Sequence, residues 1–330
     1  MNVSPSIQTK SGESFRALHG FAGATVLAFG VALVLGSGGL PFDRPAVGTH
    51  ELIPNLMTQL MQIAFALVII GLAFLATRGR PAVDFEARTP GVTAARREMI
   101  ALLVYGAVVL GVGNAFGIGL HLHGSVFGPT HHLAPADAVV WAIYNGVFFA
   151  LIPYLVFRRR GYGHRELGLK SEDAKKDFLV IAVILLVESI GELVTFPGIF
   201  SLSARQLALG VPLTLVLHLL GTGLPVMIFI YSLLFPRYLK VTGSRASAAV
   251  LGALTYAGLH LVEYWTVYDS LAHGLLSVAF VFLQFAYPGL IKSVLTLRTG
   301  NAWVHLWAYH AIAPHVTVDT PLIVRVFGIS

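Results

Sequence analysis

The sequence contains no cysteine and little charge: only 12% of its 330 residues are Asp, Glu, Lys or Arg. Without cysteine, disulfide bonds, thiolate nucleophiles and cysteine-bound metal centres are excluded. A soluble protein carries about 25% charged residues, so the low fraction also argues against a soluble fold. Hydrophobic residues make up 56% of the chain and recur in runs of about 20, the length of a helix that crosses a bilayer. The sequence therefore predicts an all-α polytopic membrane protein.

The apolar runs predict about nine membrane spans, with ends placed only to within a few residues. The spans are expected at residues 18–40, 53–76, 99–120, 136–157, 178–200, 209–235, 246–267, 273–293 and 300–318. Residues 1–17 then form a short cytoplasmic tail, residues 18–200 an N-terminal group of transmembrane helices, and residues 201–330 a transmembrane core. Bilayer lipid is the expected surrounding, and the bacterial inner (plasma) membrane is the expected location.

The positive charges predict how the chain is oriented. Arg or Lys occurs in each of the loops 77–97, 158–177, 236–245 and 294–299, whereas the loops 121–135 and 268–272 contain neither and 201–208 contains one arginine. Loops rich in Arg and Lys stay on the cytoplasmic side, so we expect the N-terminus inside and the C-terminus outside. The same clustering accounts for the net charge of +6, and no nucleic-acid partner is expected.

Six ionisable side chains inside the predicted spans are the best guide to function. They are Glu188, Glu192, Glu263, His218, His260 and His310. An ionisable group in hydrocarbon is costly and marks a functional candidate. Spacings of three and four residues place His260 with Glu263, and Glu188 with Glu192, on shared helix faces. At about 1.5 Å of rise per residue, these groups reach a similar depth in four spans. His305, five residues before His310, is expected on a different face.

These residue types suggest two kinds of chemistry. A buried Glu beside a His can activate a water molecule, the Glu as general base and the His as orienting group or oxyanion donor. Several His with a Glu could instead bind zinc. Helix–helix hydrogen bonds or a structural ion pair are the non-catalytic explanations of the same residues.

A second group of histidines lies in the loop after the third predicted span, at His121, His123, His131 and His132. On the outer face this loop could bind a metal, or its imidazoles could simply be exposed to water.

The last spans carry two recognisable motifs. One reads Arg298-Thr299-Gly300-Asn301-Ala302-Trp303 and is followed by His310; the other reads Tyr256-Ala257-Gly258-Leu259-His260. Through these motifs, residues 209–318 resemble the CAAX-protease and bacteriocin-processing (CPBP) family of intramembrane glutamate-type endopeptidases. The family pattern has a Glu-Glu-x-x-x-Arg span, a Phe-x-x-x-His span, and a last span with His-x-x-x-Asn or Asp after an Arg-Thr-Gly turn. The resemblance implies a CPBP-like core in residues 201–330.

The sequence departs from the family pattern at its first motif. Val226 and Met227 stand where the two glutamates are expected, and Tyr231 stands at the arginine position. Pro314 replaces the Asn or Asp of the last motif. In the family the paired glutamates are thought to activate water while the histidines support the water and the oxyanion. The resemblance therefore implies either a substitute base or a non-catalytic relative.

The leading function is an intramembrane CPBP-like endopeptidase that acts on a membrane-associated peptide or protein. In an active enzyme, Glu263 or Glu192 is the expected base, and His260 and His310 position water and stabilise the oxyanion. The residues expected to bind substrate are Tyr256, His218 and Trp303.

Two alternatives remain open. One is a pseudoenzyme that binds a membrane partner without cleaving it. The other is a transporter or metal-handling protein that uses the His and Glu residues, favoured by a helix interruption at residues 221–225, which a proline kink explains equally well. The sequence specifies no cofactor.

Overall fold

The computed structural model describes residues 11–43, 48–120 and 133–330, and within these ranges the chain is helical with connecting turns and no β-strand. Seven helices in the described ranges are long and apolar enough to cross a membrane. The chain is therefore a helical membrane protein, as predicted. In order, the helical segments are α1 (Ser11–Leu35), α2 (Leu52–Ala76), η1 (Glu86–Arg88), α3 (Val92–Ala115), α4 (Pro135–Asn145), η3 (Gly146–Leu151), α5 (Ile152–Arg159), α6 (Ala174–Thr195), η4 (Pro197–Ser201), α7 (Ala204–His218), η5 (Leu219–Gly223), α8 (Leu224–Val226), η6 (Met227–Leu234), α9 (Phe235–Thr242), α10 (Arg245–Leu259), α11 (Leu271–Thr299), α12 (Ala302–His305), η7 (Leu306–His310), η8 (Ile312–Thr317) and α13 (Val318–Val326).

Two of the nine predicted spans are built differently from the other seven. The span expected at 246–267 corresponds to α10, which has only 15 residues and ends at Leu259. The span expected at 300–318 corresponds to the consecutive short segments α12, η7, η8 and α13, which extend to Val326. Neither is a single regular helix of spanning length.

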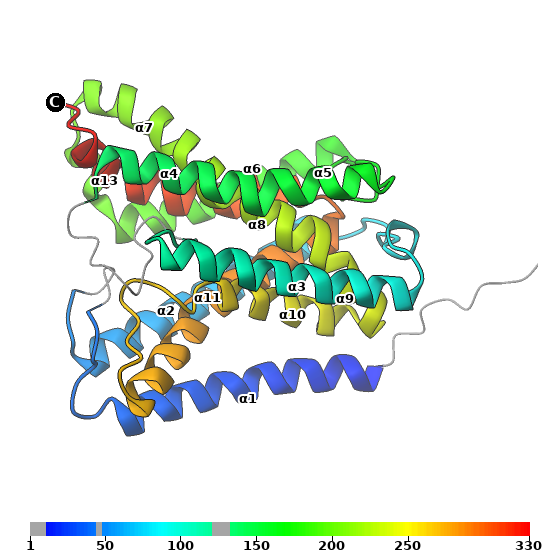
Figure 1. Ribbon diagram of the computed structural model, residues 1–330, viewed down its shortest axis with the longest axis horizontal. Helices are drawn as coiled ribbons and strands as arrows, with labels where there is room; N and C mark the ends of the chain where they lie inside the picture. Colours follow the sequence, from blue (N-terminus) through cyan, green and yellow to red (C-terminus); the bar gives the residue numbers. More distant parts are fainter. Residues whose placement is uncertain (1–10, 44–47, 121–132) are drawn as a thin grey trace, which may run out of the picture.

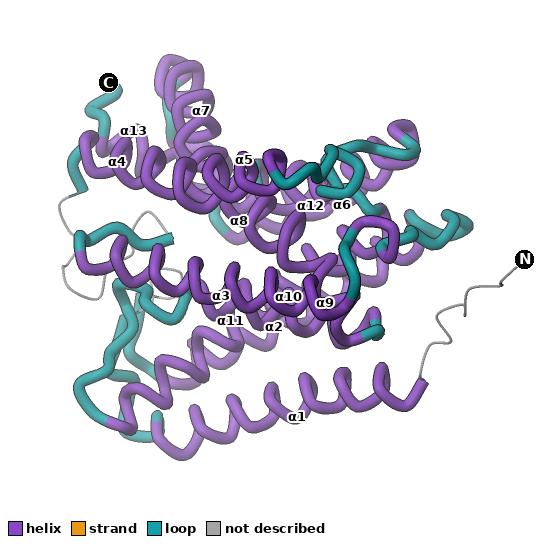
Figure 2. Tube along the Cα trace, turned by 45° about the vertical axis from the view of Figure 1, so that its right-hand side comes forward, coloured by secondary structure: helices purple, strands orange, loops and turns teal. Residues whose placement is uncertain are grey.

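The helices run along the long direction of the molecule, with α1 at one side of the bundle (Figure 1). Helix α11 packs against α1, α2 and α10, and α6 packs against η7 and η8. Two long helices are central, Ala204–Thr242 and Leu271–Thr299. In each of them, 67% of an apolar 18-residue stretch is buried, against 17–33% of the corresponding stretch in the other five helices. The start of α1 and the C-terminus lie at opposite ends in both views (Figures 1 and 2).

The long helix Ala204–Thr242 is wound as a π-helix over η5 and η6. Residues 221–225, expected to be an interruption, remain helical. Pro225 has no N–H and its ring would clash with the carbonyl of residue 221 in α-geometry, and wider π-winding relieves this clash. Gly221 also lies against the ring of Trp141, where an added Cβ would come within 2.2 Å of Trp141 Cη2. The helix is widened here and not broken.

The turn at residues 298–301 anchors the last helix to the C-terminal end of α2, to η1 and to the start of α6. Arg298 Nε donates to Thr77 Oγ1 at 2.8 Å. Gly300 has a left-handed backbone (φ 67°), and its carbonyl accepts a hydrogen bond from Arg88 Nη1 at 2.6 Å. The Asn301 side chain caps α12 and donates to the buried Asp177 at 2.9 Å. The Arg-Thr-Gly-Asn sequence thus makes the turn and ties it to three other segments.

Candidate functional site

The clearest ionisable pair inside the bundle is His260 with Glu263. Helix α10 ends at Leu259 and His260 is its C-cap residue, so the chain turns back at this point. The turn brings Glu263 Oε1 to 2.6 Å from His260 Nδ1, and the imidazole N–H donates to the carboxylate. His260 is 0% exposed and Glu263 is 3% exposed. The structure therefore places a Glu carboxylate within hydrogen-bonding reach of His260.

Aromatic rings hold the His260 imidazole in one orientation. Phe285 on α11 stacks on it with 3.8 Å between ring centroids and 5° between planes. The ring of Tyr256, one turn earlier on α10, meets His260 edge-on at 4.8 Å and His310 edge-on at 6.0 Å. Three predicted site residues, Tyr256, His260 and His310, thus lie together although His310 comes from the last helix.

His310 also contacts the long π-wound helix. Its Nε2 lies 3.5 Å from Thr222 Oγ1 of η5, and it is 1% exposed. Thr222 had no place in the sequence-based site, because the contact joins helices that are far apart in the sequence.

The last helix presents a row of three buried histidines. The centroid of His310 lies 6.4 Å from that of His305 and 5.3 Å from that of His315. The expectation that His305 and His310 point to different faces is wrong, because η7 and η8 are π-helices, and their wider winding brings residues five apart closer to one face than an α-helix does. Pro314, which lacks an N–H, favours this winding.

A buried lysine, Lys292 on α11, lies beside the histidines and was missing from the sequence-based site. Its Nζ is 3.7 Å from the ring centroid of Tyr256 and 5.2 Å from that of Tyr309, and Lys292 is 1% exposed. Glu188 on α6, which is also 1% exposed, interacts with it electrostatically. Lysine inside an apolar span is itself a sign of a functional site.

Glu192 and His218 belong to a different part of the bundle. His218 Nε2 lies 3.4 Å from Asp319 Oδ2, and its ring stacks on that of His315 with centroids 4.6 Å apart. Asp319 also interacts electrostatically with half-buried Glu192. The structure therefore groups these predicted residues with His315 and Asp319 rather than with Glu263.

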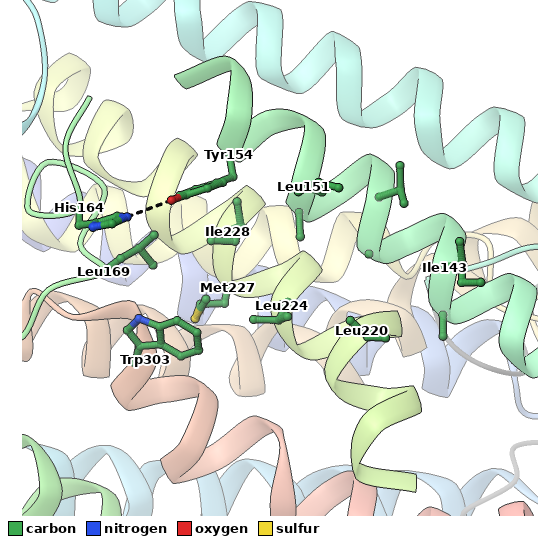
Figure 3. A pocket seen from close by; sticks show the side chains of 14 residues that line it. Ile143, Leu151, Tyr154, His164, Leu169, Leu220, Leu224, Met227, Ile228 and Trp303 are labelled. Carbon is green, nitrogen blue, oxygen red and sulfur yellow. Dashed lines mark hydrogen bonds between the residues drawn. The ribbon is translucent and has the colours of Figure 1, made fainter. Parts of the chain in front are cut away.

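Trp303 lines a third region, an apolar cavity of about 590 Å³ between α4, η3, α5 and the long π-wound helix (Figure 3). Met227, one of the two residues at the expected glutamate positions, also lines it, while Val226 is fully buried. At one end, Tyr154 Oη lies 2.9 Å from His164 Nε2. No carboxylate lines this cavity in the part of the chain that the structure describes.

Tyr231, which stands at the arginine position of the family pattern, has structural contacts. The hydroxyl of Tyr231 donates to the carbonyl of Gly289 at 3.0 Å, and its ring lies 4.3 Å from that of His305. The histidines of the loop 121–132, for which a metal site was considered, lie outside the described residues.

No protein-family model, curated protein or solved structure matches this chain.

Proposed function

We propose that this protein is an intramembrane endopeptidase with a CPBP-like core, in which Glu263 and His260 act together as the base that activates water. The observation that carries the proposal is the 2.6 Å contact between His260 Nδ1 and Glu263 Oε1, buried beside His310 and Tyr256. The resemblance of the last two motifs to the CPBP pattern supports the same reaction class. The substrate is a membrane-associated peptide or protein.

The geometry suggests a division of roles. Because Nδ1 of His260 donates to Glu263, the other ring nitrogen, Nε2, is the one that can accept a proton. A water proton moves to Nε2, the water oxygen bonds to the peptide carbonyl carbon, and the proton then passes to the leaving amine as the peptide bond breaks. Glu263 stabilises the imidazolium formed in between. His310, with Thr222 at 3.5 Å, is positioned as the donor for the oxyanion.

We also propose that the chain crosses the membrane nine times, with its N-terminus on the cytoplasmic side. The end of α5, the start of α3 and helix α9 lie at the same end of the molecule as the start of α1 (Figure 1). The basic loops adjoin these segments, which supports a cytoplasmic position for that end. With α10 and the segmented last helix counted as spans, the C-terminus reaches the opposite side.

A second candidate function is favoured by the apolar cavity. It holds about 590 Å³, which is enough for a peptide side chain or part of a lipid chain, and Met227 occupies it where the family has a glutamate. A CPBP-like pseudoenzyme would bind a membrane partner in this cavity and leave it uncleaved.

One experiment separates the two functions. The purified protein in liposomes is incubated with solubilised bacterial membrane proteins in water enriched in oxygen-18, and new peptide C-termini are identified by mass spectrometry. If the protein is an endopeptidase, we expect labelled C-termini with the wild type and none with Glu263→Gln. Absence of labelled termini with the wild type, together with partner capture that is lost on filling the cavity with Ala150→Phe, would instead favour the pseudoenzyme.

A further inference from the structure

We infer that His218, His315 and Asp319 form a binding site for one divalent transition-metal ion such as Zn²⁺. This inference does not depend on the proposed peptidase function, because it rests on a different group of residues. One nitrogen of each histidine and a carboxylate oxygen of Asp319 all lie within 4.8 Å of one another. Both histidines are buried, and the Asp319 side chain is 22% exposed.

The separations between the ligand atoms suit a metal. Asp319 Oδ2 lies 3.1 Å from His315 Nδ1 and 3.4 Å from His218 Nε2. In a tetrahedral zinc site with bonds of about 2.0–2.1 Å, neighbouring ligand atoms are separated by about 3.3 Å. Two of the three separations between these ligand atoms are therefore already close to those of a zinc site.

The fold brings the three ligands from two separate helices. His218 is the last residue of α7, where the long helix changes to π-winding. His315 lies in the π-helix η8 and Asp319 in α13, four residues later. The ring of Trp141 packs edge-on against His218 at 5.3 Å. π-Segments are frequent at functional sites, and here both histidines lie on or beside one.

The composition of the site selects the ion. Two imidazoles and one carboxylate are ligands for zinc and neighbouring transition metals, whereas Mg²⁺ and Ca²⁺ prefer oxygen ligands alone. Three protein ligands leave a fourth position for water. Helix α13, which carries Asp319, lies beside the C-terminus (Figure 1), and the partial exposure of the Asp319 side chain provides an entry route.

The test measures zinc bound to the full chain. All proteins carry glutamine in place of His121, His123, His131 and His132, so that the other histidine-rich segment does not contribute. The parent, His315→Ala, Asp319→Asn and His273→Ala are purified in detergent, stripped with a chelator, and dialysed against Zn²⁺. His273 is a matched control because it pairs with Asp269 at the same four-residue spacing but is exposed.

We expect about one zinc per chain in the parent and in His273→Ala, and none in His315→Ala or Asp319→Asn. We also expect Zn²⁺ to raise the melting temperature of the parent but not of Asp319→Asn, which gives a second readout if His315→Ala fails to fold. A parent that binds no zinc would overturn the inference. Equal zinc content in the parent and Asp319→Asn would overturn it as well, and would make this group a structural hydrogen-bonded cluster.

Discussion

The imidazoles of His305 and His310 lie 6.4 Å apart between ring centroids although five residues separate them in the chain. In an α-helix this spacing would turn them to different faces, but the π-wound segments η7 and η8 bring His305, His310 and His315 into one row. The row links the His260–Glu263 pair, through Tyr256, to the group formed by His218, His315 and Asp319. The winding of one helix thus determines which ionisable side chains meet.

The turn at Gly300 gives a first prediction about stability. An added Cβ at Gly300 would lie 2.6 Å from Val83 Cγ1 and 2.9 Å from Arg88 Nη2. Gly243 is the matched control, because it has a similar φ (63° against 67°) but no atom within 4 Å of its added Cβ. Both changes to alanine incur the left-handed backbone cost of about 1–2 kcal/mol. We expect Gly300→Ala to lower the free energy of unfolding in detergent by more than Gly243→Ala does; equal losses would show that the contacts with Val83 and Arg88 impose no constraint.

Lys292 on α11 and Glu188 on α6 are both 1% exposed and interact electrostatically, which predicts energetic coupling between the two helices. Replacing one of them leaves the other buried without this partner, whereas replacing both does not. Lys292→Met and Glu188→Gln should therefore each destabilise the protein, and the double variant should be more stable than the sum of the two losses implies, with a coupling of about 0.5–3 kcal/mol. Denaturation of the four proteins in detergent micelles measures this cycle. Simple additivity would mean that the two groups do not interact.

A third prediction concerns Arg237, which is fully buried although its position suggested a basic loop. Its Nη2 lies 2.8 Å from Glu98 Oε2, and its guanidinium lies 4.4 Å from the Phe157 ring centroid. Tyr162 also donates to Glu98; burial raises the pKa of this tyrosine despite the nearby Arg237 charge, so it remains a donor at neutral pH.

We expect Glu98→Ala to lower the free energy of unfolding by about 3–5 kcal/mol, as for other buried charges left without a partner. Lys176→Ala is the control, because its pair with Asp173 is exposed and such pairs contribute about 0–1 kcal/mol. Chemical denaturation of both variants gives the comparison. Losses of similar size would indicate that the Glu98–Arg237 pair behaves as a surface ion pair.

Much of the fold could be predicted from the sequence, because span length and hydropathy are local properties. The helical membrane class followed from the apolar runs, and seven described helices meet the criteria for spanning. His260 and Glu263 do pair, but through the turn that follows α10 and not on the shared helix face that their spacing predicted. The bounds of the long helix did not follow from the sequence: the basic residues after 235 suggested a loop, whereas the helix continues to Thr242.

The rest of the site depended on features that sequence periodicity does not report. The row of histidines requires π-winding, which a rule based on 3.6 residues per turn cannot anticipate. The separation of Glu192 and His218 from Glu263 depends on which helices are neighbours. Asp319 was missed because the last span was expected to end at residue 318, the residue before it, whereas the helix continues to Val326.

Tyr256 yields a prediction about catalysis. Its ring contacts both His260 and His310, so the ring and not the hydroxyl is expected to position the imidazoles. Tyr256→Phe, which restores the family residue, should keep most of the cleavage rate, whereas Tyr256→Ala should lower kcat by about 10-fold or more through misplacement of the two imidazoles. Rates are measured on a peptide identified by oxygen-18 labelling. A large loss in Tyr256→Phe would point to a role for the hydroxyl instead.

The most direct test of the Glu263–His260 pair is kcat/KM for that labelled peptide with the wild type, Glu263→Gln and Asp269→Asn. Asp269 is the control, since it is an exposed carboxylate paired with His273. General acid–base groups contribute about 10²–10⁴-fold, so we predict a loss in that range for Glu263→Gln and an unchanged value for Asp269→Asn. A Glu263→Gln protein that cleaves at the wild-type rate would contradict the assignment of this pair as the base.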